Sequence, residues 1–293
     1  MNYELPYVQP RKPYALILKS LILFFAIVLI GGIAGLNIRL LAASLFYFLV
    51  TFYYLNKTSN NVEERMVIAV FTLPILLLYV PLHIANFNAG IISIPVTGAH
   101  FVAIMFGYLT YKIKKKARYI FPVVLIVTST WVTFKGFYLW LHKLNFGTYN
   151  GRVSYILPAP IEGTQDNGDG ISSNDVREKV ILLDFWNSRC GVCFQKFPQL
   201  QTLYDRYKGN PSFRLFTVNK PLEGDTVNQA FAMLRNRNYA FPALLPFDKN
   251  LAESYGVKFY PTTIIIDKSG MVVYRGSIEN AGEVVEKLLG EGD

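Results

Sequence analysis

The segment Val180-Ile-Leu-Leu-Asp-Phe-Trp-Asn-Ser-Arg-Cys-Gly-Val-Cys193 decides the fold of the second half of the chain. Its apolar start is typical of a buried strand, a short polar stretch follows, and a helical pattern occupies 194–208. The segment therefore predicts a strand whose end leads through a loop to two cysteines at the start of a helix.

The spacing of the two cysteines suits reversible disulfide chemistry. Two intervening residues let the sulfur atoms reach each other across one turn. The unsatisfied N–H groups of the helix N-terminus favour the thiolate of Cys190. A thiolate attacks a partner disulfide, and a second thiol then resolves the mixed disulfide. We therefore predict that Cys190 is the nucleophile and Cys193 the resolving cysteine.

Two other uses of a C-x-x-C pair are weighed against this prediction. A structural zinc site needs four ligands, but the chain holds only two cysteines and no histidine after His142. A zinc site completed by carboxylates stays open, as does a permanent structural disulfide. The ring closed by such a disulfide is so small that it constrains the unfolded chain little.

The distribution of charge separates the two halves of the chain. Residues 1–143 hold 13 Lys and Arg against 3 acids, whereas residues 144–293 hold 16 against 17, within a total net charge of +9. A basic chain can bind nucleic acid or lie in a membrane. Because the excess is confined to the apolar half, we predict a membrane protein with no nucleic-acid partner.

The first half reads as long apolar runs separated by short polar stretches, which is the pattern of membrane spans. We predict an all-α transmembrane domain over 1–143, a linker and the start of an outer domain over 144–178, and an α/β domain over 179–293. The five predicted spans are 16–35, 40–55, 66–84, 98–111 and 119–141.

Basic residues flank these spans unevenly, and basic flanks stay on the cytoplasmic side of a membrane. They precede span one and lie between spans two and three and between spans four and five, whereas the opposite turns contain Arg39 alone. An odd number of spans then places the N-terminus inside and the second half outside the cytoplasmic (inner) membrane. The flanking basic residues are Arg11, Lys12, Lys19, Lys57, Arg65, Lys112, Lys114, Lys115, Lys116 and Arg118.

Further motifs surround the cysteines at fixed distances. Asp184 lies six residues before Cys190, Trp186 lies four before it, and Pro198 lies five after Cys193. Tyr260-Pro261-Thr262 precedes a strand pattern at 263–267. At these spacings, the last half of the chain resembles the thioredoxin fold, and more closely the membrane-tethered TlpA/ResA-like thiol-disulfide oxidoreductases.

The resemblance implies roles for the residues at the matching positions. Asp184 is expected to be a buried proton carrier, because desolvation raises the pKa of a carboxylic acid beside the dithiol. Pro261 is expected to form the cis-proline loop against the disulfide. Substrate contacts are expected from Trp186, Arg189, Tyr260 and Thr262. A strand-end acid, a plain turn and a packing aromatic are the structural alternatives for Asp184, Pro261 and Trp186.

The sequence departs from the family pattern on both sides of the cysteines. Thioredoxins usually carry Trp before the first cysteine and Pro before the second, and this chain has Arg189 and Val192. A cation beside Cys190 is expected to favour its thiolate, whereas loss of the proline relaxes the start of the helix.

The resemblance implies an enzyme that exchanges its disulfide with exported proteins, in the reductase direction, with the Cys190–Cys193 pair as its only redox group. It implies no metal and no organic cofactor. Because the membrane half holds no cysteine, a separate membrane electron donor is expected.

Two rival functions stay open. In the first, the bundle binds a quinone, a haem or a partner complex, since five spans exceed what an anchor needs. His83, His100 and His142 lie near the outer ends of predicted spans, where they either hold a metal or haem or simply lie at the interface. In the second rival, the outer domain is a redox-inactive binding module.

Overall fold

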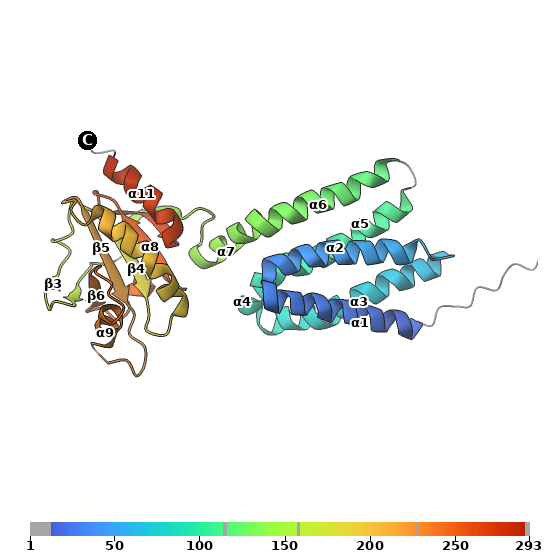
Figure 1. Ribbon diagram of the computed structural model, residues 1–293, viewed down its shortest axis with the longest axis horizontal. Coiled ribbons are helices and arrows are strands. Elements are labelled where there is room, and N and C mark those ends of the chain that lie inside the picture. Colours follow the sequence, from blue (N-terminus) through green and yellow to red (C-terminus); the bar gives the residue numbers. More distant parts are fainter. Residues whose placement is uncertain (1–12, 114–115, 157–158, 227, 291–293) are drawn as a thin grey trace, which may run out of the picture. The chain divides into compact units, whose positions relative to one another are not determined.

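The computed structural model describes residues 13–113, 116–156, 159–226 and 228–290, and the chain forms two compact units, Met1–Tyr138 and Leu139–Asp293 (Figure 1). The first unit is helical, and the second is built on one mixed β-sheet. Four of the basic residues used to predict the orientation, Arg11, Lys12, Lys114 and Lys115, lie outside the described residues.

Five helices of the described chain are long and apolar enough to cross a membrane, which confirms the predicted all-α bundle of about five spans. The fourth begins before residue 98, at Ile91, and the fifth runs from Lys116 to Phe146 through a π-helical turn. The elements are α1 Pro13–Ala34, α2 Leu36–Leu55, α3 Asn61–Ala85, α4 Phe87–Gly90, η1 Ile91–Ser93, α5 Ile94–Lys112, η2 Lys116–Tyr119, α6 Ile120–Trp131, η3 Val132–Gly136 and α7 Phe137–Phe146.

The second helix corrects one expectation. The predicted span starts at residue 40 and leaves Arg39 in the connecting turn, but α2 begins at Leu36. Gly35, with φ of 94°, makes the turn alone. Arg39 therefore lies inside the first turn of α2, where only 9% of its surface is exposed.

The helices of the first unit bury a core of aromatic and aliphatic side chains and expose apolar side chains on the outside. Tyr47, Phe71 and Ile75 are fully or almost fully buried, whereas Leu29 and Leu77 are mostly exposed. Helices α2 and α5 approach closely because Gly107 has no side chain to hold Phe48 and Thr51 away. An apolar exterior around a packed core is what a lipid-facing bundle requires, and this part of the protein anchors it to a membrane.

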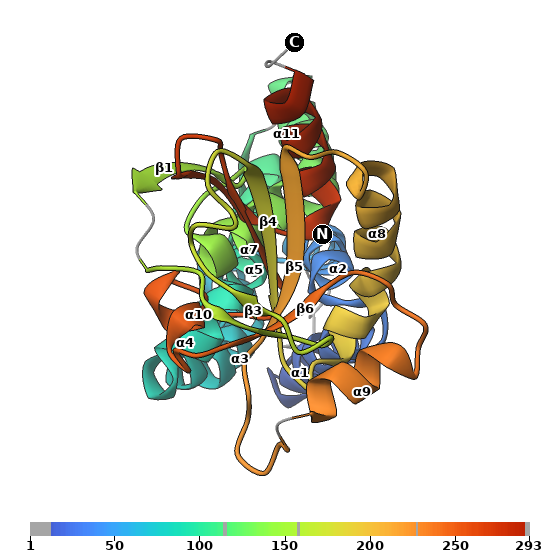
Figure 2. The ribbon, with the colours of Figure 1, turned by 90° about the vertical axis from the view of Figure 1, so that its left-hand side faces the viewer.

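The second unit contains an eight-stranded sheet in the order β1-β8-β7-β4-β5-β6-β2-β3, and Figure 2 shows β4 and β5 side by side. The strand β4 at its centre runs parallel to β5 and antiparallel to β7. The elements are β1 Arg152–Ile156, β2 Gly163–Gln165, β3 Gly170–Ile171, β4 Val180–Trp186, α8 Gly191–Tyr207, β5 Phe213–Asn219, α9 Gln229–Arg235, β6 Ala243–Pro246, α10 Leu251–Ser254, β7 Thr262–Ile266, β8 Met271–Gly276 and α11 Ile278–Gly290.

Every residue of β4 is buried because helices and loops cover both faces of the sheet. Leu182 and Trp186 point into the cluster under α8, α9 and α11, whereas Ile181, Leu183 and Phe185 point into the cluster under α10. Alternation along the strand places Asp184 on the face of α8. The central strand thus ends with its acid directed toward the helix that carries the dithiol.

The segment expected as linker and start of the outer domain supplies three strands of the sheet. Strand β1 pairs with β8 at one edge, and β2 pairs with both β6 and β3 at the other. Residues from 152 onward therefore belong to the same sheet as β4.

Candidate active site

The two cysteines form a disulfide at the start of α8. Cys190 is the N-cap residue of the helix, and Cys193 lies in its first turn. The Sγ atoms are 2.03 Å apart, and the backbone N–H of Cys193 donates to Sγ of Cys190 at 3.1 Å. In the reduced protein, the same N–H and the positive end of α8 favour a thiolate at Cys190.

The two sulfur atoms differ in accessibility. Cys193 is fully buried, whereas Cys190 is partly exposed at the end of the α8 cluster. A substrate disulfide reaches an exposed sulfur more readily than a buried one, so this difference favours the predicted order, with Cys190 as the nucleophile and Cys193 as the resolving cysteine.

Asp184 lies on the face of the sheet that α8 covers and has no ionic partner among the described residues. It is 3% exposed, and the hydroxyl of Thr263 donates to Oδ1 at 2.8 Å. Burial raises the pKa of Asp184 from 3.8 to about 7, the Thr263 hydrogen bond acts in the opposite direction, and the charge of Glu279 adds to the rise. A carboxyl group with this pKa can both accept and release a proton near neutral pH.

The cis-proline loop meets the end of β4 through strand register. Phe185 pairs with Thr262, so Pro261 falls beyond the strand end, level with Trp186 and the start of the loop to Cys190. The Tyr260–Pro261 peptide bond is cis, and the hydroxyl of Thr262 donates to the carbonyl of Phe259 at 2.7 Å. Tyr260 packs against the α8 cluster, as Cys190 does.

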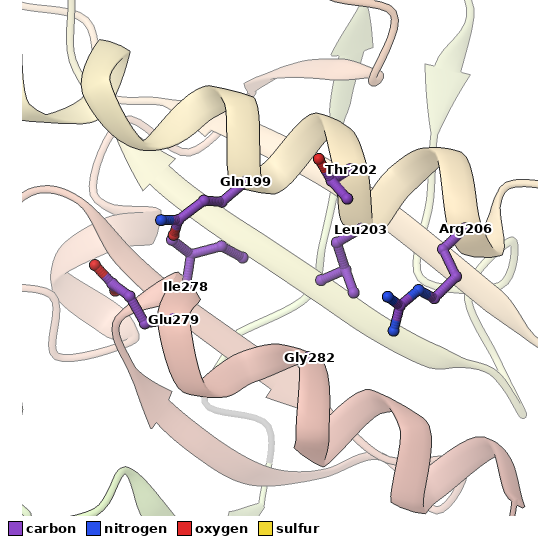
Figure 3. A pocket seen from close by; sticks show the side chains of 7 residues that line it. All are labelled: Gln199, Thr202, Leu203, Arg206, Ile278, Glu279 and Gly282. Carbon is purple, nitrogen blue, oxygen red and sulfur yellow. The ribbon is translucent and has the colours of Figure 1, made fainter.

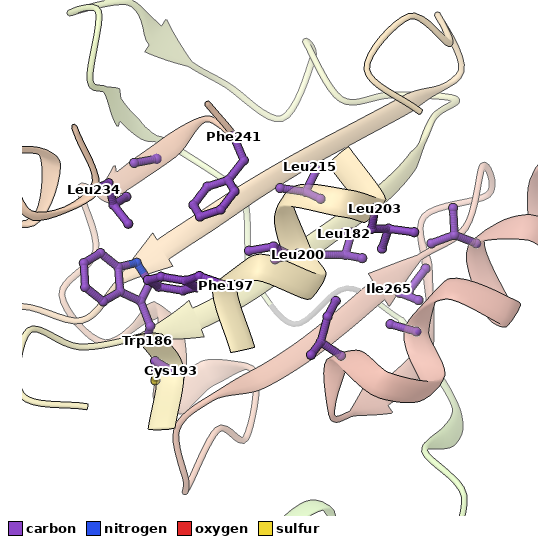
Figure 4. Close-up of a cluster of buried hydrophobic side chains, with 14 of the residues drawn as sticks. Leu182, Trp186, Cys193, Phe197, Leu200, Leu203, Leu215, Leu234, Phe241 and Ile265 are labelled. Carbon is purple, nitrogen blue, oxygen red and sulfur yellow. The ribbon is translucent and has the colours of Figure 1, made fainter. Parts of the chain in front are cut away.

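Trp186, which we expected among the substrate contacts, is fully buried. Its ring packs edge-on against Phe194 and Phe197 in the α8 cluster, and Figure 4 shows Phe197 beside it. Because the indole has no accessible surface, Trp186 supports the active-site loop from below and does not contact a substrate chain. The exposed apolar side chains next to the expected substrate residues are Val192 and Phe259.

Arg189, the cation expected beside Cys190, is hydrogen-bonded to another loop. Its guanidinium donates to the carbonyl of Glu223 at 2.8 Å, on the loop after β5. The neighbouring Ser188 hydroxyl donates to the Asp225 carboxylate at 2.8 Å, and the N–H of Lys220 donates to the carbonyl of Trp186 at 2.8 Å. Loop 220–225 is therefore hydrogen-bonded to the active-site loop, and one of these bonds holds the Arg189 guanidinium.

Sequence reasoning did not find Thr263, Ser188 or Asp225. For Thr263, a signal exists, because it lies two residues after Pro261 at the start of a strand pattern. The contact between Ser188 and Asp225 joins residues 37 positions apart. No local pattern marks that contact.

A groove of about 340 Å³ between α8 and α11 shares no residue with the dithiol site (Figure 3). Glu279, at its rim, forms an ion pair with Lys196. The groove is lined by Gln199, Thr202, Leu203, Arg206, Ile278, Glu279 and Gly282.

Each histidine lies against a different backbone carbonyl, that of Thr148 at 2.7 Å in the case of His142. Nδ1 of His83 lies 2.6 Å from the carbonyl of Tyr79 and Nδ1 of His100 lies 2.7 Å from that of Val96, whereas His142 belongs to the second unit. Among the described residues, no group of three or more His, Cys, Asp or Glu side chains is placed to hold a metal ion.

A dithiol at the N-terminus of a helix, a buried acid under it and a cis-proline loop beside it define a thioredoxin-like domain of the thiol-disulfide oxidoreductase class. Comparison with known proteins agrees. Residues 157–275 match the model of the AhpC/TSA family. The C-terminal half is therefore an AhpC/TSA-type thioredoxin-like domain.

Two ResA relatives point to the same class, and one solved structure is also similar in part. The chain is 28% identical to the thiol-disulfide oxidoreductase ResA of Bacillus subtilis over 107 residues, which are 36% of this chain and 58% of that relative. It is 25% identical to ResA of Bacillus thuringiensis over 180 residues, covering 60% of this chain and 96% of the relative. A solved thiol:disulfide interchange protein from Bacteroides sp. is 22% identical, with a TM-score of 0.42 over 48% of this chain and 93% of that one.

Proposed function

We propose that this protein is a membrane-anchored, extracytoplasmic protein-disulfide reductase that acts on exported proteins through Cys190 and Cys193. The observation that carries the proposal is the arrangement of one accessible sulfur, one buried sulfur and one buried acid at the end of β4. The similarity to ResA proteins supports the reaction class.

In the proposed reaction, the Cys190 thiolate attacks one sulfur of a substrate disulfide, so that a mixed disulfide forms and a substrate thiolate leaves. Asp184 takes the proton of the Cys193 thiol, and the new thiolate attacks Sγ of Cys190. The Cys190–Cys193 disulfide forms, and the second substrate thiolate leaves. Two electrons pass to the substrate, whose sulfurs take up two protons, one of them from Asp184.

Renewal of the dithiol needs two electrons and two protons from outside this chain. The sequence holds only the two active-site cysteines, so the bundle has no dithiol to relay electrons. We propose a separate membrane protein with a reduced dithiol as the donor, and the Cys190–Cys193 pair as the only redox group of this chain.

Basic flanks support the orientation in the cytoplasmic membrane, with the N-terminus inside and the second unit outside. Of the described flanking residues, Lys57, Arg65 and Lys112 lie at ends of α2, α3 and α5 that share one side of the bundle. A phosphatase reporter fused after Asp293 is expected to be active only outside the cytoplasm. Activity of a cytoplasm-restricted reporter at the same position would contradict this orientation.

Trapping tests the reaction. In Cys193→Ser, mixed disulfides with substrates cannot be resolved and are expected to accumulate on Cys190, visible as adducts that reductant removes. Cys190→Ser is the matched control and is expected to form none. The purified wild type is expected to reduce insulin disulfides, and Cys190→Ser to lose at least a thousandfold in rate. Alkylation of Cys190 without any adducts or insulin reduction would contradict the proposal.

A further inference from the structure

A cluster of polar side chains lies inside the helical bundle, apart from the dithiol chemistry. Arg39 and Tyr47 come from α2, Tyr79 from α3 and His100 from α5. The Arg39 guanidinium lies 5.2 Å from the centre of the Tyr79 ring and donates to its hydroxyl. The His100 ring lies 4.8 Å from the Tyr47 ring and 5.6 Å from the Tyr79 ring. Ionisable side chains held within a membrane bundle commonly serve a function.

Arg39 is a buried cation, and no described residue supplies it with a counter-charge. Its stem packs over Gly31, where even a methyl group would clash with it. The only acids among the described residues of this unit are Glu63 and Glu64, at the opposite end of α3, and Glu64 pairs with Lys112 at 2.6 Å. A guanidinium keeps its proton in proteins, and a buried charge without a partner is costly.

Three buried polar atoms of the cluster have no hydrogen-bond partner within the described parts of the chain: Nε of Arg39, Oη of Tyr47 and Nε2 of His100. The first two can donate. Nδ1 of His100 lies 2.7 Å from the carbonyl of Val96, which can only accept, so Nδ1 carries the proton and Nε2 is an acceptor. The cluster thus offers two donors, one acceptor and a positive charge. Buried polar atoms normally have partners, so this set favours a bound ligand that supplies them.

The position of the cluster adds to the preference for an anion. Arg39 lies in the first turn of α2, where the helix dipole is positive. This turn follows Gly35, at the end of the bundle, so Arg39 lies near the depth of lipid headgroups, and Tyr47 lies about two turns further along α2. The guanidinium fork matches the oxygens of a phosphate.

We propose that Arg39, Tyr47 and His100 form a binding site for a phosphate group that carries a hydroxyl. Phosphate oxygens accept from Arg39 Nε and Tyr47 Oη, and the hydroxyl donates to His100 Nε2. Two sources share this chemistry. One is a hydroxyl-bearing lipid headgroup such as that of phosphatidylglycerol, and the other is free hydrogen phosphate.

The test uses the full-length protein in dodecyl maltoside, which contains no phosphate, and follows the melting temperature of the bundle. Phosphatidylglycerol and inorganic phosphate are titrated separately, with phosphatidylcholine and diacylglycerol as ligands that lack the hydroxyl or the phosphate. Stabilisation by phosphatidylglycerol at lower concentration than by phosphatidylcholine identifies the lipid as the source. Stabilisation by inorganic phosphate identifies the free ion.

Substitutions locate the site. Arg39→Gln is expected to raise the midpoint concentration of the ligand at least tenfold, and Tyr47→Phe, which keeps the ring, about threefold or more. Lys135→Gln removes an exposed cation of the same unit and is expected to leave the midpoint unchanged. Should Arg39→Gln not fold, Tyr47→Phe alone decides. Absence of stabilisation by either phosphate ligand, or equal midpoints in wild type and Tyr47→Phe, would overturn the proposal. Insulin reduction is expected to be unchanged in all three variants.

Discussion

Each unit of the molecule buries one charged side chain that has no ionic partner among the described residues, and the two units deal with it differently. Asp184 lies under the dithiol with one hydrogen bond from Thr263, and burial raises its pKa to about 7. When it binds a proton, the carboxyl group is neutral and the cost of burying a charge no longer applies. Arg39 lies in the bundle, and a guanidinium has no such escape. A buried acid therefore becomes a proton carrier, whereas a buried guanidinium calls for an anion.

Replacing Asp184 by Asn breaks the comparison on the side of the acid, with the largest expected effect. Without a proton acceptor for Cys193, insulin reduction at pH 7 is expected to fall by roughly tenfold to a hundredfold. The wild-type rate is expected to rise with pH through about 7, and the variant to lose this dependence. Asp205→Asn, at an exposed position on the same helix as Cys193, serves as the control. An unchanged pH profile in Asp184→Asn would remove Asp184 from the mechanism.

The same substitution has a stability effect of opposite sign. Because the pKa of Asp184 is raised from 3.8 to about 7 in the folded protein, the folded state binds more protons than the unfolded chain between these values. Stability is therefore lost as pH rises from about 4 to 7. In oxidised protein at pH 8, Asp184→Asn is expected to increase the free energy of unfolding by up to about 4 kcal/mol. At pH 4 the gain should vanish, and urea unfolding at both values measures it.

Replacing Arg39 by Met tests the other half of the comparison, the buried guanidinium. In detergent without phosphate, the variant removes an uncompensated charge and is expected to stabilise the bundle by about 2 kcal/mol. With saturating phosphate ligand, the wild type should recover this difference. Lys135→Met, at an exposed position, is expected to change little. Destabilisation by Arg39→Met without ligand would show that the cation is compensated within the protein.

The sequence could predict the features that depend on local pattern. Apolar runs gave the five helices because each must be long enough to cross a membrane, and the run 180–186 gave the central strand. The placement of the two cysteines and of Asp184 could also be predicted, because it depends only on their spacing along one strand and the helix after it. The change from long apolar runs to a polar stretch also marked the boundary between the basic first half and the second half.

Features that depend on distant pairing could not be predicted. Strands β2 and β3 are three and two residues long and form only against β6 and each other. Arg39 looked like a turn residue because a single glycine at 35 makes the turn and lets α2 start early. Trp186 is buried because Phe197 packs against it. Arg189 turns toward a loop more than 30 residues away because its guanidinium donates to a carbonyl there.

A smaller effect is expected at Thr263, which tunes the acid. Thr263→Val keeps the side-chain shape and removes the hydrogen bond that favours the carboxylate, so the pKa of Asp184 should rise further. The rate of insulin reduction at pH 7 is expected to fall about twofold to threefold, with its pH profile displaced to higher pH. Thr202→Val, on the exposed side of α8, is the control. A profile that does not move would mean that the bond only fixes the position of Asp184.

The smallest effect is expected at Asp225, where the charge is partly exposed to solvent. Its carboxylate accepts from Ser188 and from the N–H of Leu222, and these bonds hold its pKa below the usual range. It stays ionised beside Arg189 and so offsets the cation next to Cys190. Asp225→Asn keeps the size of the side chain and removes the charge. The rate of alkylation of reduced Cys190 at pH 6.5 is expected to rise about twofold to threefold, because the thiolate gains from the less compensated guanidinium.

Two further variants separate charge from loop anchoring at Asp225. Ser188→Ala removes the bond between the loops but keeps the carboxylate, so a smaller rise in alkylation than in Asp225→Asn is expected if charge decides. Asp175 makes the same kind of bonds to the hydroxyl and N–H of Ser172 in a loop before β4, and Asp175→Asn is expected to leave alkylation unchanged. Equal rises in Ser188→Ala and Asp225→Asn would instead show that loop 220–225 acts by holding the cysteine in place. In that case Arg189 faces the loop for structural reasons, and the thiolate depends on the helix N-terminus alone.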